Sequence, residues 1–338
     1  MNNYRVSLKE VDRVEIVTLM DNYVDVLIQG TDVVTRPPDN YVDVLIQGTD
    51  VVTRPPLSKG GDIPSDTLLA EHGLSMLVTV QKGKDKHTIL FDTGYSQIGV
   101  PHNIKMLGID PKQIEAIVLS HGHMDHTGSL YSVLDMIPGR VPLVVHPEAF
   151  IGPRYFGLAD GRKLEFPQTL VRADLQNQNV ELMESNTPTL LADDMIAVTG
   201  EVERVTAFEK GLPNATLERN GKIEDDPIAD DQALVVNLKG KGLVVISGCA
   251  HAGIINTVIF ATKIAGIEKI HTIIGGFHLS GPFFEQIIEE TIMELKKISP
   301  QVLVPMHCTG WKAIQRFSEE FPAAFILNSV GSKFTLGA

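Results

Sequence analysis

The sequence predicts an α+β protein in which two β-sheets are sandwiched between helical layers, an αββα arrangement with a small inserted subdomain. Two observations predict this fold class. Short apolar runs of strand length recur along the chain, and segments with helical spacing are interspersed among them. At 338 residues, of which 43% are hydrophobic, the chain is long enough to bury a large core, so we expect a single domain over residues 1–338.

Strands are expected wherever short apolar runs lie between turn-forming residues. In the first half of the chain these runs are residues 14–19, 74–80, 87–91, 116–119 and 141–145. In the second half they are residues 195–199, 233–238, 243–246 and 302–304. Helices are expected at 254–265, at 284–298, where apolar side chains recur at helical spacing, and from residue 311 onward.

Two segments interrupt this pattern. Residues 152–194 are polar, contain prolines and are weakly periodic, which predicts an insertion or small subdomain. Residues 21–38 recur without a single change as residues 39–56. Because the fold needs only one copy as a strand, we expect the other copy of this tandem duplication, 21–56, to form a poorly packed loop.

Composition limits the partners of the chain. The 29 basic and 42 acidic residues give a net charge of -13, which disfavours nucleic acid as a partner. No apolar run approaches the roughly 18 to 20 residues that span a bilayer, and the N-terminus lacks the order of a signal peptide. We therefore expect a cytoplasmic protein with a small-molecule substrate and no membrane partner. A homodimer is expected only from how commonly soluble proteins pair.

The segment 117–128 carries the strongest chemical signal in the sequence. A predicted strand ends there in the order His121-Gly-His123-Met-Asp125-His126. Two histidines two residues apart on an extended backbone project to the same side and suit one cation. Asp125 and His126 follow after the chain turns and suit a second cation, as in two-metal centres whose ions lie about 3.5 to 4 Å apart.

This segment resembles the metal-binding signature of the metallo-β-lactamase superfamily, and the resemblance extends over residues 65–315. Asp92, in Phe-Asp-Thr-Gly, resembles the strand-end aspartate that orients the metal loop in that family. His307 occupies the position of the last metal-binding histidine. The resemblance therefore implies an enzyme of this fold that binds one or two Zn²⁺ ions, with Fe or Mn as alternatives.

Two departures from the family pattern change the expected ligand set. The third histidine of the family is absent at residues 199–202, and Cys249 stands where a bridging aspartate is usual. We expect His251, two residues later, to replace the missing imidazole. Cys249 is either a thiolate ligand or a small buried thiol. The expected metal ligands are His121, His123, Asp125, His126, His251 and His307, with Cys249 as a further candidate.

A set of short motifs narrows the resemblance to the 7,8-dihydropterin-6-methyl-4-(β-D-ribofuranosyl)-aminobenzene-5'-phosphate synthase branch. These motifs are EHGLS, FDTG, SHGHMDHTG, GCAH, GGFHL and MHCTG. That branch implies a transferase similar to dihydropteroate synthase, joining a pterin methyl group to an aromatic amine. Asp125, Asp92 and His278 are the expected catalytic residues. His278 follows a glycine pair, and Phe283 and Phe284 nearby are either stacking walls for the substrate or core side chains.

Other functions stay open at this point. A metal-dependent hydrolase of phosphodiester, lactone or thioester bonds would use the same ligands to activate water. A non-catalytic or redox metal-binding protein would have the same fold without hydrolase or transferase activity. The cysteines Cys249 and Cys308 each adjoin a histidine, which favours proximity to a metal over a structural disulfide. The acidic pairs at 225–226 and 230–231 lack calcium-loop spacing and are expected to lie in a solvated loop.

Overall fold

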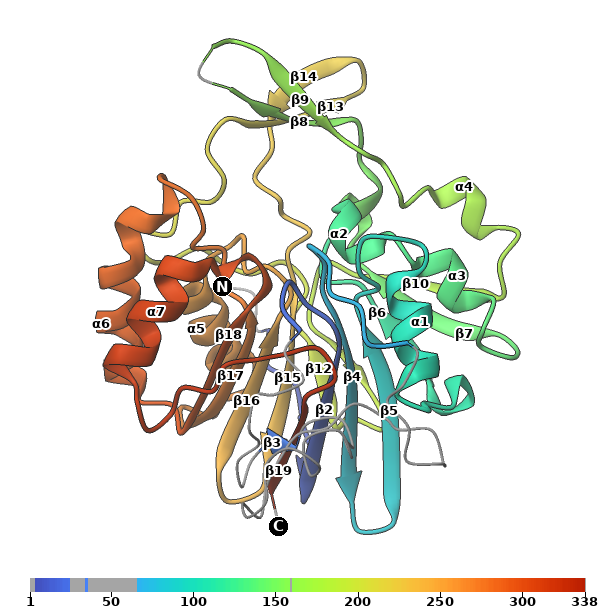
Figure 1. The fold of residues 1–338 in the computed structure, drawn as a ribbon, viewed down its shortest axis with the longest axis vertical. Coiled ribbons are helices and arrows are strands. Elements are labelled where there is room, and N and C mark those ends of the chain that lie inside the picture. The colour runs from blue at the N-terminus through green and yellow to red at the C-terminus, as the bar shows by residue number, and fades with distance from the viewer. Residues whose placement is uncertain (1–3, 25–33, 36–65, 159, 338) are drawn as a thin grey trace.

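The computed structural model describes residues 4–24, 34–35, 66–158 and 160–337. Two large β-sheets pack face to face, and helices cover both outer faces (Figure 1). The predicted αββα fold class is confirmed. The second copy of the duplicated segment, and most of the first, lies outside the described residues, so the expectation of a poorly packed copy stays a prediction.

The first sheet has eight strands, and its central strands run parallel so that three of them end at the same edge. Strand β5 pairs in parallel with β6, and β6 pairs in parallel with β7. The loops after these strands therefore meet at one edge of the sheet. In spatial order the strands are β10 (Val180–Glu184), β7 (Val141–Val145), β6 (Ala116–Val118), β5 (Asp85–Phe91), β4 (Ser75–Lys82), β2 (Arg13–Met20), β19 (Lys333–Gly337) and β3 (Val34–Thr35).

The second sheet likewise brings three chain segments to one edge. Strands β16, β17 and β18 run parallel, so the residues that follow them, near 248, 277 and 307, are neighbours. In spatial order the strands are β11 (Thr189–Leu191), β12 (Ile196–Val198), β15 (Ala233–Leu238), β16 (Gly242–Ser247), β17 (Ile270–Gly276) and β18 (Val302–Met306), with β1 (Glu10–Val11) beside β15.

Helices cover the outer faces of both sheets (Figure 1). On the second sheet lie α5 (Ile254–Ala265), α6 (Ile288–Ile298) and α7 (Trp311–Glu320), close to the predicted ranges. The predicted helix at 284–298 begins with a 3₁₀ turn, η3 (Phe284–Ile287), before α6. The other helical segments are α1 (Gly99–Met106), η1 (Pro111–Gln113), α2 (Met124–Thr127), α3 (Leu130–Leu134), η2 (Pro147–Phe150), α4 (Arg172–Leu175) and η4 (His307–Thr309). None of the helices in the described ranges is both long and apolar enough to cross a membrane.

The core between the sheets is built from the inward-facing residues of the strands, which alternate along each strand with residues that face outward. Val14 and Val78 of the first sheet belong to the same buried cluster as Val236 and Ile246 of the second. Every residue of β15 and β16 is buried, because the other sheet covers one face and helices cover the other. Burying each such side chain contributes about 1.5 to 3 kcal/mol, which makes the sheets a rigid support for the loops at their edge.

A third, four-stranded sheet projects from one end of the sandwich (top of Figure 1). We call it the small sheet; it contains β8 (Arg154–Gly157), β9 (Lys163–Phe166), β13 (Ala215–Arg219) and β14 (Lys222–Asp225). The chain segments that form the small sheet differ from the expected insertion at 152–194. Half of the small sheet comes from later in the chain, and β10 and β11 leave the insertion to pair with the two large sheets.

Candidate metal centre

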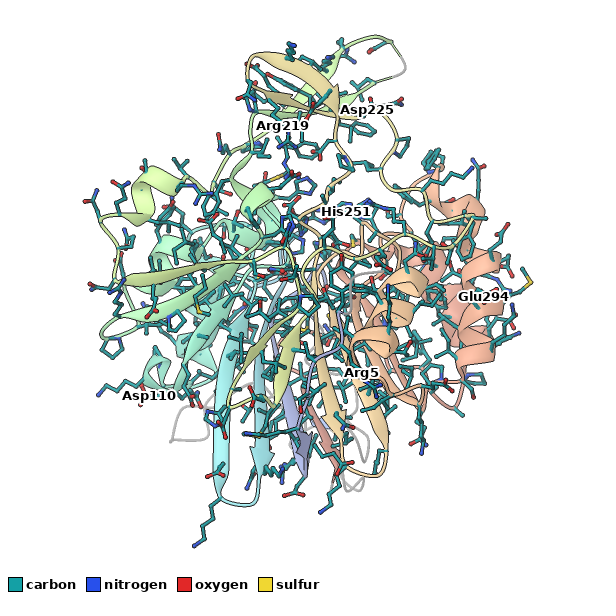
Figure 2. The ribbon with its side chains drawn as sticks, turned by 180° about the vertical axis from the view of Figure 1, so that it is seen from behind. Arg5, Asp110, Arg219, Asp225, His251 and Glu294 are labelled. Carbon is teal, nitrogen blue, oxygen red and sulfur yellow. The ribbon has the colours of Figure 1, made fainter. Side chains whose placement is uncertain are left out.

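All the residues expected to bind metal lie on loops at one edge of the sandwich, beneath the small sheet. The loop after β6 carries His121 and His123, the short helix α2 that follows carries Asp125 and His126, the turn after β16 carries Cys249 and His251, and His307 follows β18. Figure 2 shows His251 at the end of the sandwich that faces the small sheet. The parallel pairing within each sheet brings these ends together, although the outermost ligands are 186 positions apart, from His121 to His307.

Three histidines form a first cluster. The Nε2 atom of His121 lies 3.0 Å from Nδ1 of His123 and 3.2 Å from Nε2 of His251. A cation with Zn–N distances of about 2.0 to 2.1 Å fits at the centre of such a triangle. All three side chains are buried. His251 therefore lies where the imidazole absent from residues 199–202 is needed.

The electrostatics of this first cluster favour neutral imidazoles. Burial, reinforced by neighbouring positive groups, holds the pKa of His121 and of His251 well below the usual range. Burial, together with the nearby charge of Arg154, lowers the pKa of His123 to about 4. A neutral imidazole keeps a lone pair for a metal, so the donor set fits a cation.

Asp125, His126, Cys249 and His307 form a second cluster. The Nε2 atom of His126 lies 3.1 Å from Sγ of Cys249 and 3.7 Å from Oδ2 of Asp125. The same carboxylate oxygen lies 3.3 Å from Nε2 of His307. One carboxylate, one sulfur and two imidazoles are a suitable tetrahedral set for zinc. The structure thus brings together every residue expected to bind metal.

Asp92 orients the ring of His126 in the second cluster. It is fully buried, and its Oδ2 atom lies 2.7 Å from Nδ1 of His126, which leaves Nε2 facing the cluster. Its other oxygen accepts the backbone N–H of Ser120 at 2.6 Å. Burial lowers the pKa of His126, but the charges of Asp92 and Asp125 outweigh that effect and raise the pKa to about 9. Such a carboxylate–histidine pair is the usual support of a metal-binding imidazole.

Asp125 stays ionised in this environment. Burial alone would raise its pKa, yet the charges of His126 and His307 hold the pKa far below the usual range. An anion at this position offsets the charge of a bound cation. A carboxylate with so low a pKa is a better ligand than proton acceptor.

The sequence analysis missed Asp21 and Asn22, which hold His307 in place. The backbone N–H of His307 donates to Oδ1 of Asp21 at 2.9 Å, and Oδ1 of Asn22 lies 3.2 Å from Nδ1 of His307. The ring of His72 stacks on His307 with centroids 5.0 Å apart. The only signal in the sequence was that Asp21 follows a strand, as Asp92 does.

The small sheet reaches the centre through a buried ion pair. Arg154 of β8 donates to Oδ1 of Asp230 at 2.8 Å, and Oδ2 of Asp230 accepts the backbone N–H of Gly122 at 2.7 Å. Phe166 of β9 stacks on the ring of His123, with centroids 4.8 Å apart. The expectation of a solvated loop is therefore wrong for Asp226, Asp230 and Asp231, which are buried, whereas Asp225 is exposed.

His278 lies beside the first cluster. Its ring centroid is 4.1 Å from that of His251, and its backbone has a positive φ of 47°, which is uncommon outside glycine. The buried Nδ1 atom of His278 has no hydrogen-bond partner among the described residues. Cys249 and Cys308 are both free thiols, in agreement with the expectation that they form no disulfide.

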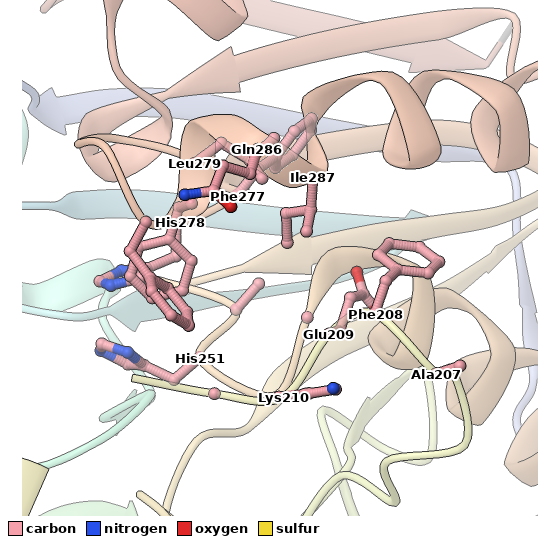
Figure 3. Close-up of a pocket in the computed structure, with 15 residues that line it drawn as sticks. Ala207, Phe208, Glu209, Lys210, His251, Phe277, His278, Leu279, Gln286 and Ile287 are labelled. Carbon is pink, nitrogen blue, oxygen red and sulfur yellow. The ribbon is translucent and has the colours of Figure 1, made fainter. Parts of the chain in front are cut away.

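A cavity of about 320 Å³ opens next to His251 and His278 (Figure 3). Its walls are mostly apolar and aromatic, which is typical of a small-molecule site. A buried carboxyl group, Glu209, also lines it. Its large apolar side chains are Phe208, Phe277, Leu279, Phe283, Phe284 and Ile287.

Comparisons with known proteins agree with the fold. Residues 70–216 match the metallo-beta-lactamase superfamily, and the chain belongs to this superfamily of enzymes, which usually bind metals. Over 263 residues the chain is 35% identical to the 7,8-dihydropterin-6-methyl-4-(β-D-ribofuranosyl)-aminobenzene-5'-phosphate synthase of Methanocaldococcus jannaschii, covering 76% of this chain and 87% of the relative.

Two further relatives cover most of the chain. The uncharacterized protein MJ0448 of the same organism is 33% identical over 256 residues, covering 74% of this chain and 88% of its own length. The crystal structure of Tm1679, a metal-dependent hydrolase of the beta-lactamase superfamily, is 25% identical with a TM-score of 0.67. That match covers 96% of this chain and 100% of Tm1679.

Proposed function

We propose that this protein is a metal-dependent transferase that joins a pterin methyl group to an aromatic amine. The observation that carries the proposal is the pair of adjoining ligand clusters beside an aromatic-lined cavity. The similarity to the M. jannaschii synthase over three quarters of the chain supports the choice of reaction. A condensation of two ring systems needs a pocket with apolar walls that shelters the reacting atoms from water.

Each of the two clusters would hold one cation in this proposal. His121, His123 and His251 would hold one Zn²⁺, and Asp125, His126, Cys249 and His307 would hold a second one. When bound, these cations supply positive charge that stabilises a departing pyrophosphate group. Asp92 keeps His126 in the tautomer and orientation that a ligand needs.

The reaction needs little acid–base chemistry from the protein. The amine nitrogen forms a C–N bond to the pterin methylene carbon, and the C–O bond to pyrophosphate breaks. The bonding electron pair leaves with pyrophosphate, and the amine proton is released to solvent. His278, with an unused ring nitrogen at the cavity wall, is positioned to donate a hydrogen bond to the leaving group.

The proposal is tested by supplying the purified, zinc-loaded protein with a 6-hydroxymethyl-dihydropterin pyrophosphate and a para-substituted aniline. Formation of the C–N product with one pyrophosphate released per turnover is the expected result. The variant His123→Ala should abolish product formation, and His87→Ala, which alters a histidine outside both clusters, should not. Absence of product with the fully metallated protein would contradict the transferase.

A second candidate is a metal-dependent hydrolase, favoured by the similarity to Tm1679. The same donor set suits the activation of water for hydrolysis of phosphodiester, lactone or thioester bonds. A substrate screen of these three bond types, run beside the condensation assay, separates the two functions. Turnover in the screen without condensation would replace the transferase by a hydrolase.

A further inference from the structure

We infer that the cavity beside His251 and His278 seats a flat heteroaromatic ring, and that Glu209 selects rings with N–H donors, such as the 2-aminopyrimidinone ring of a pterin. The inference rests on the proposed function, because it assigns the part of that site that holds the pterin. It adds a ring-binding site and a residue that determines which ring is accepted.

The shape of the cavity suits a flat ring. Phe284 lies against His278, with ring centroids 4.6 Å apart, and Phe283 lies 5.3 Å from Phe284. Phe283 is 50% exposed, which is unusual for so large an apolar side chain at the wall of a cavity. A flat ligand that covers it would bury apolar surface and gain an aromatic contact. The volume of about 320 Å³ is enough for a two-ring ligand.

Glu209 supplies a polar acceptor within this apolar wall. Its Oε1 atom accepts the backbone N–H of Ile255 at 2.8 Å, and its Oε2 atom accepts that of Asn256 at 2.8 Å and the hydroxyl of Thr206 at 3.1 Å. Because an ionised carboxylate has about four acceptor positions, Oε1 retains one for a ligand. The exocyclic 2-amino group of a pterin satisfies that position, whereas a carbonyl at the same place would leave two acceptors facing each other.

The start of α5 explains why this end of the cavity takes the ring rather than a phosphate. The first free N–H groups of the helix already bind Glu209, so they are not available to an anion. Gly253 makes this contact feasible, because a Cβ there would lie 2.2 Å from the carboxyl carbon of Glu209. The start of α5 therefore offers no site for the anionic part of a substrate, and Lys210 is the cationic side chain that lines the same cavity.

The arrangement of the cavity gives the ligand a direction. In the view of Figure 3, His251 and His278 lie at one end, and Glu209 and Phe208 lie toward the other. A pterin whose ring contacts Glu209 therefore points its 6-substituent toward His278 and the metal clusters. The ring-binding end and the reacting end of the substrate are then held by different residues.

Equilibrium binding tests the inference without turnover. Calorimetric titrations at pH 7.5 compare 6-hydroxymethylpterin with 6-hydroxymethyllumazine, which carries a carbonyl in place of the 2-amino group. The wild-type protein, with its metal bound, should prefer the pterin by at least about tenfold, since the lumazine presents a carbonyl acceptor to Glu209 at the position where the pterin presents its 2-amino donor. Glu209→Gln should reduce this preference to less than about threefold.

Two further variants test the ring contact. Phe283→Ala should weaken binding of both compounds by about fivefold to tenfold, the size of a lost aromatic contact. Trp311→Ala, a matched truncation of an aromatic side chain that is 73% exposed and does not line this cavity, should change neither affinity. Circular dichroism checks that each variant is folded. If Glu209→Gln does not fold, the wild-type preference and Phe283→Ala decide the question.

Equal wild-type affinities for the two compounds, or an unchanged affinity in Phe283→Ala, would overturn the inference. The outcome is separable from that of the proposed function. If the binding experiments give the expected result but no condensation product forms, the ring-binding site stands and the transferase proposal is contradicted. If the protein condenses the two substrates but neither Glu209→Gln nor Phe283→Ala changes its affinity for the pterin, the transferase proposal stands and the ring-binding site is contradicted.

Discussion

At the scale of single residues, the candidate centre depends on where each nitrogen, oxygen and sulfur atom points. Nδ1 of His123 and Nε2 of His251 lie 3.0 and 3.2 Å from Nε2 of His121. Burial keeps these rings neutral, so their mutual contact costs no charge repulsion. Such an arrangement is stabilised when a cation lies among the lone pairs.

Replacing His123 by alanine should remove one of the three donors of the first cluster. We expect the variant to purify with at least one equivalent of zinc fewer per chain, because two remaining imidazoles bind a cation weakly. The far-UV circular dichroism should be unchanged. Elemental analysis of the purified protein measures the metal, and His87→Ala serves as the control. An unchanged metal content would contradict the role of His123.

Asp92→Asn should weaken the second cluster without removing a ligand. An amide at this position does not hold the Nδ1 proton of His126 as a carboxylate does, so zinc affinity should fall by about 10- to 100-fold. Competition with a chromophoric zinc chelator measures this affinity. If Asp92→Asn binds zinc as tightly as the wild-type protein, the carboxylate does not support His126.

Glu209 should make folding stability depend on pH. Burial raises its pKa from 4.5 to about 7, although the N–H groups of Ile255 and Asn256 oppose the rise. Between these two pH values the folded state binds more protons than the unfolded chain, so stability falls as the pH rises. The loss from pH 4.5 to above 7 is roughly 3 kcal/mol for this group.

Urea unfolding at a series of pH values measures this effect. The stability difference between the wild-type protein and Glu209→Gln should change by that amount across the window, because the amide does not titrate. Glu10→Gln, which alters an exposed carboxyl group, is the control for the loss of one carboxylate. A flat difference for Glu209→Gln would show that this group does not titrate near neutral pH.

At the scale of elements, the small sheet is joined to the metal-binding loop by Arg154 of β8. The chain of contacts runs from Arg154 to Asp230 and from there to the backbone of Gly122, between two expected ligands. Arg154 also lies 3.4 Å from Asp226, and all three side chains are buried. The small sheet thus supports the shape of the loop as well as covering it.

Breaking this ion pair on one side should be costly. Arg154→Met leaves two buried carboxylates without their partner, and the free energy of unfolding should fall by about 3 to 5 kcal/mol. The double variant Arg154→Met/Asp230→Asn should recover part of the loss, since it removes one unpaired charge. Urea denaturation measures both changes. A loss below about 1 kcal/mol in Arg154→Met would show that the pair does not tie the sheet to the loop.

At the scale of the whole molecule, the metal centre joins the two halves of the sandwich. The first sheet supplies His121, His123, Asp125 and His126, and the second supplies Cys249, His251 and His307. Each cluster takes ligands from both sheets. A cation that binds only the folded arrangement therefore stabilises the contact between the sheets.

Removal of metal should lower the melting temperature of the protein. With zinc at about 1,000 times its dissociation constant, binding contributes about 4 kcal/mol, which chelation would remove. Calorimetric melting with and without a chelator measures the change. Adding back Zn²⁺ should restore the melting temperature, whereas Mg²⁺, which prefers oxygen ligands, should not. Identical melting curves in all conditions would argue against a cation that bridges the sheets.

Much of the site was predictable because many of its residues lie close together in the sequence. His121, His123, Asp125 and His126 lie within six residues, so their spacing and the preceding strand were enough to identify them. The placement of His251 and His307 depended on family resemblance. Asp21 escaped notice because nothing in its neighbourhood in the sequence points to His307, its partner 286 residues later.

The amino-acid order by itself determined most of the central strands of the two large sheets, the helices α5 to α7 and the character of the metal-binding loop, because these follow from short-range periodicity and ligand spacing. Only the tertiary structure decided which distant groups share a cluster, that β10 and β11 join the large sheets, and that Glu209 faces a cavity. The physical reason is that strand pairing and register set contacts between segments far apart in the chain. The local sequence pattern of a strand does not determine which other strand it pairs with.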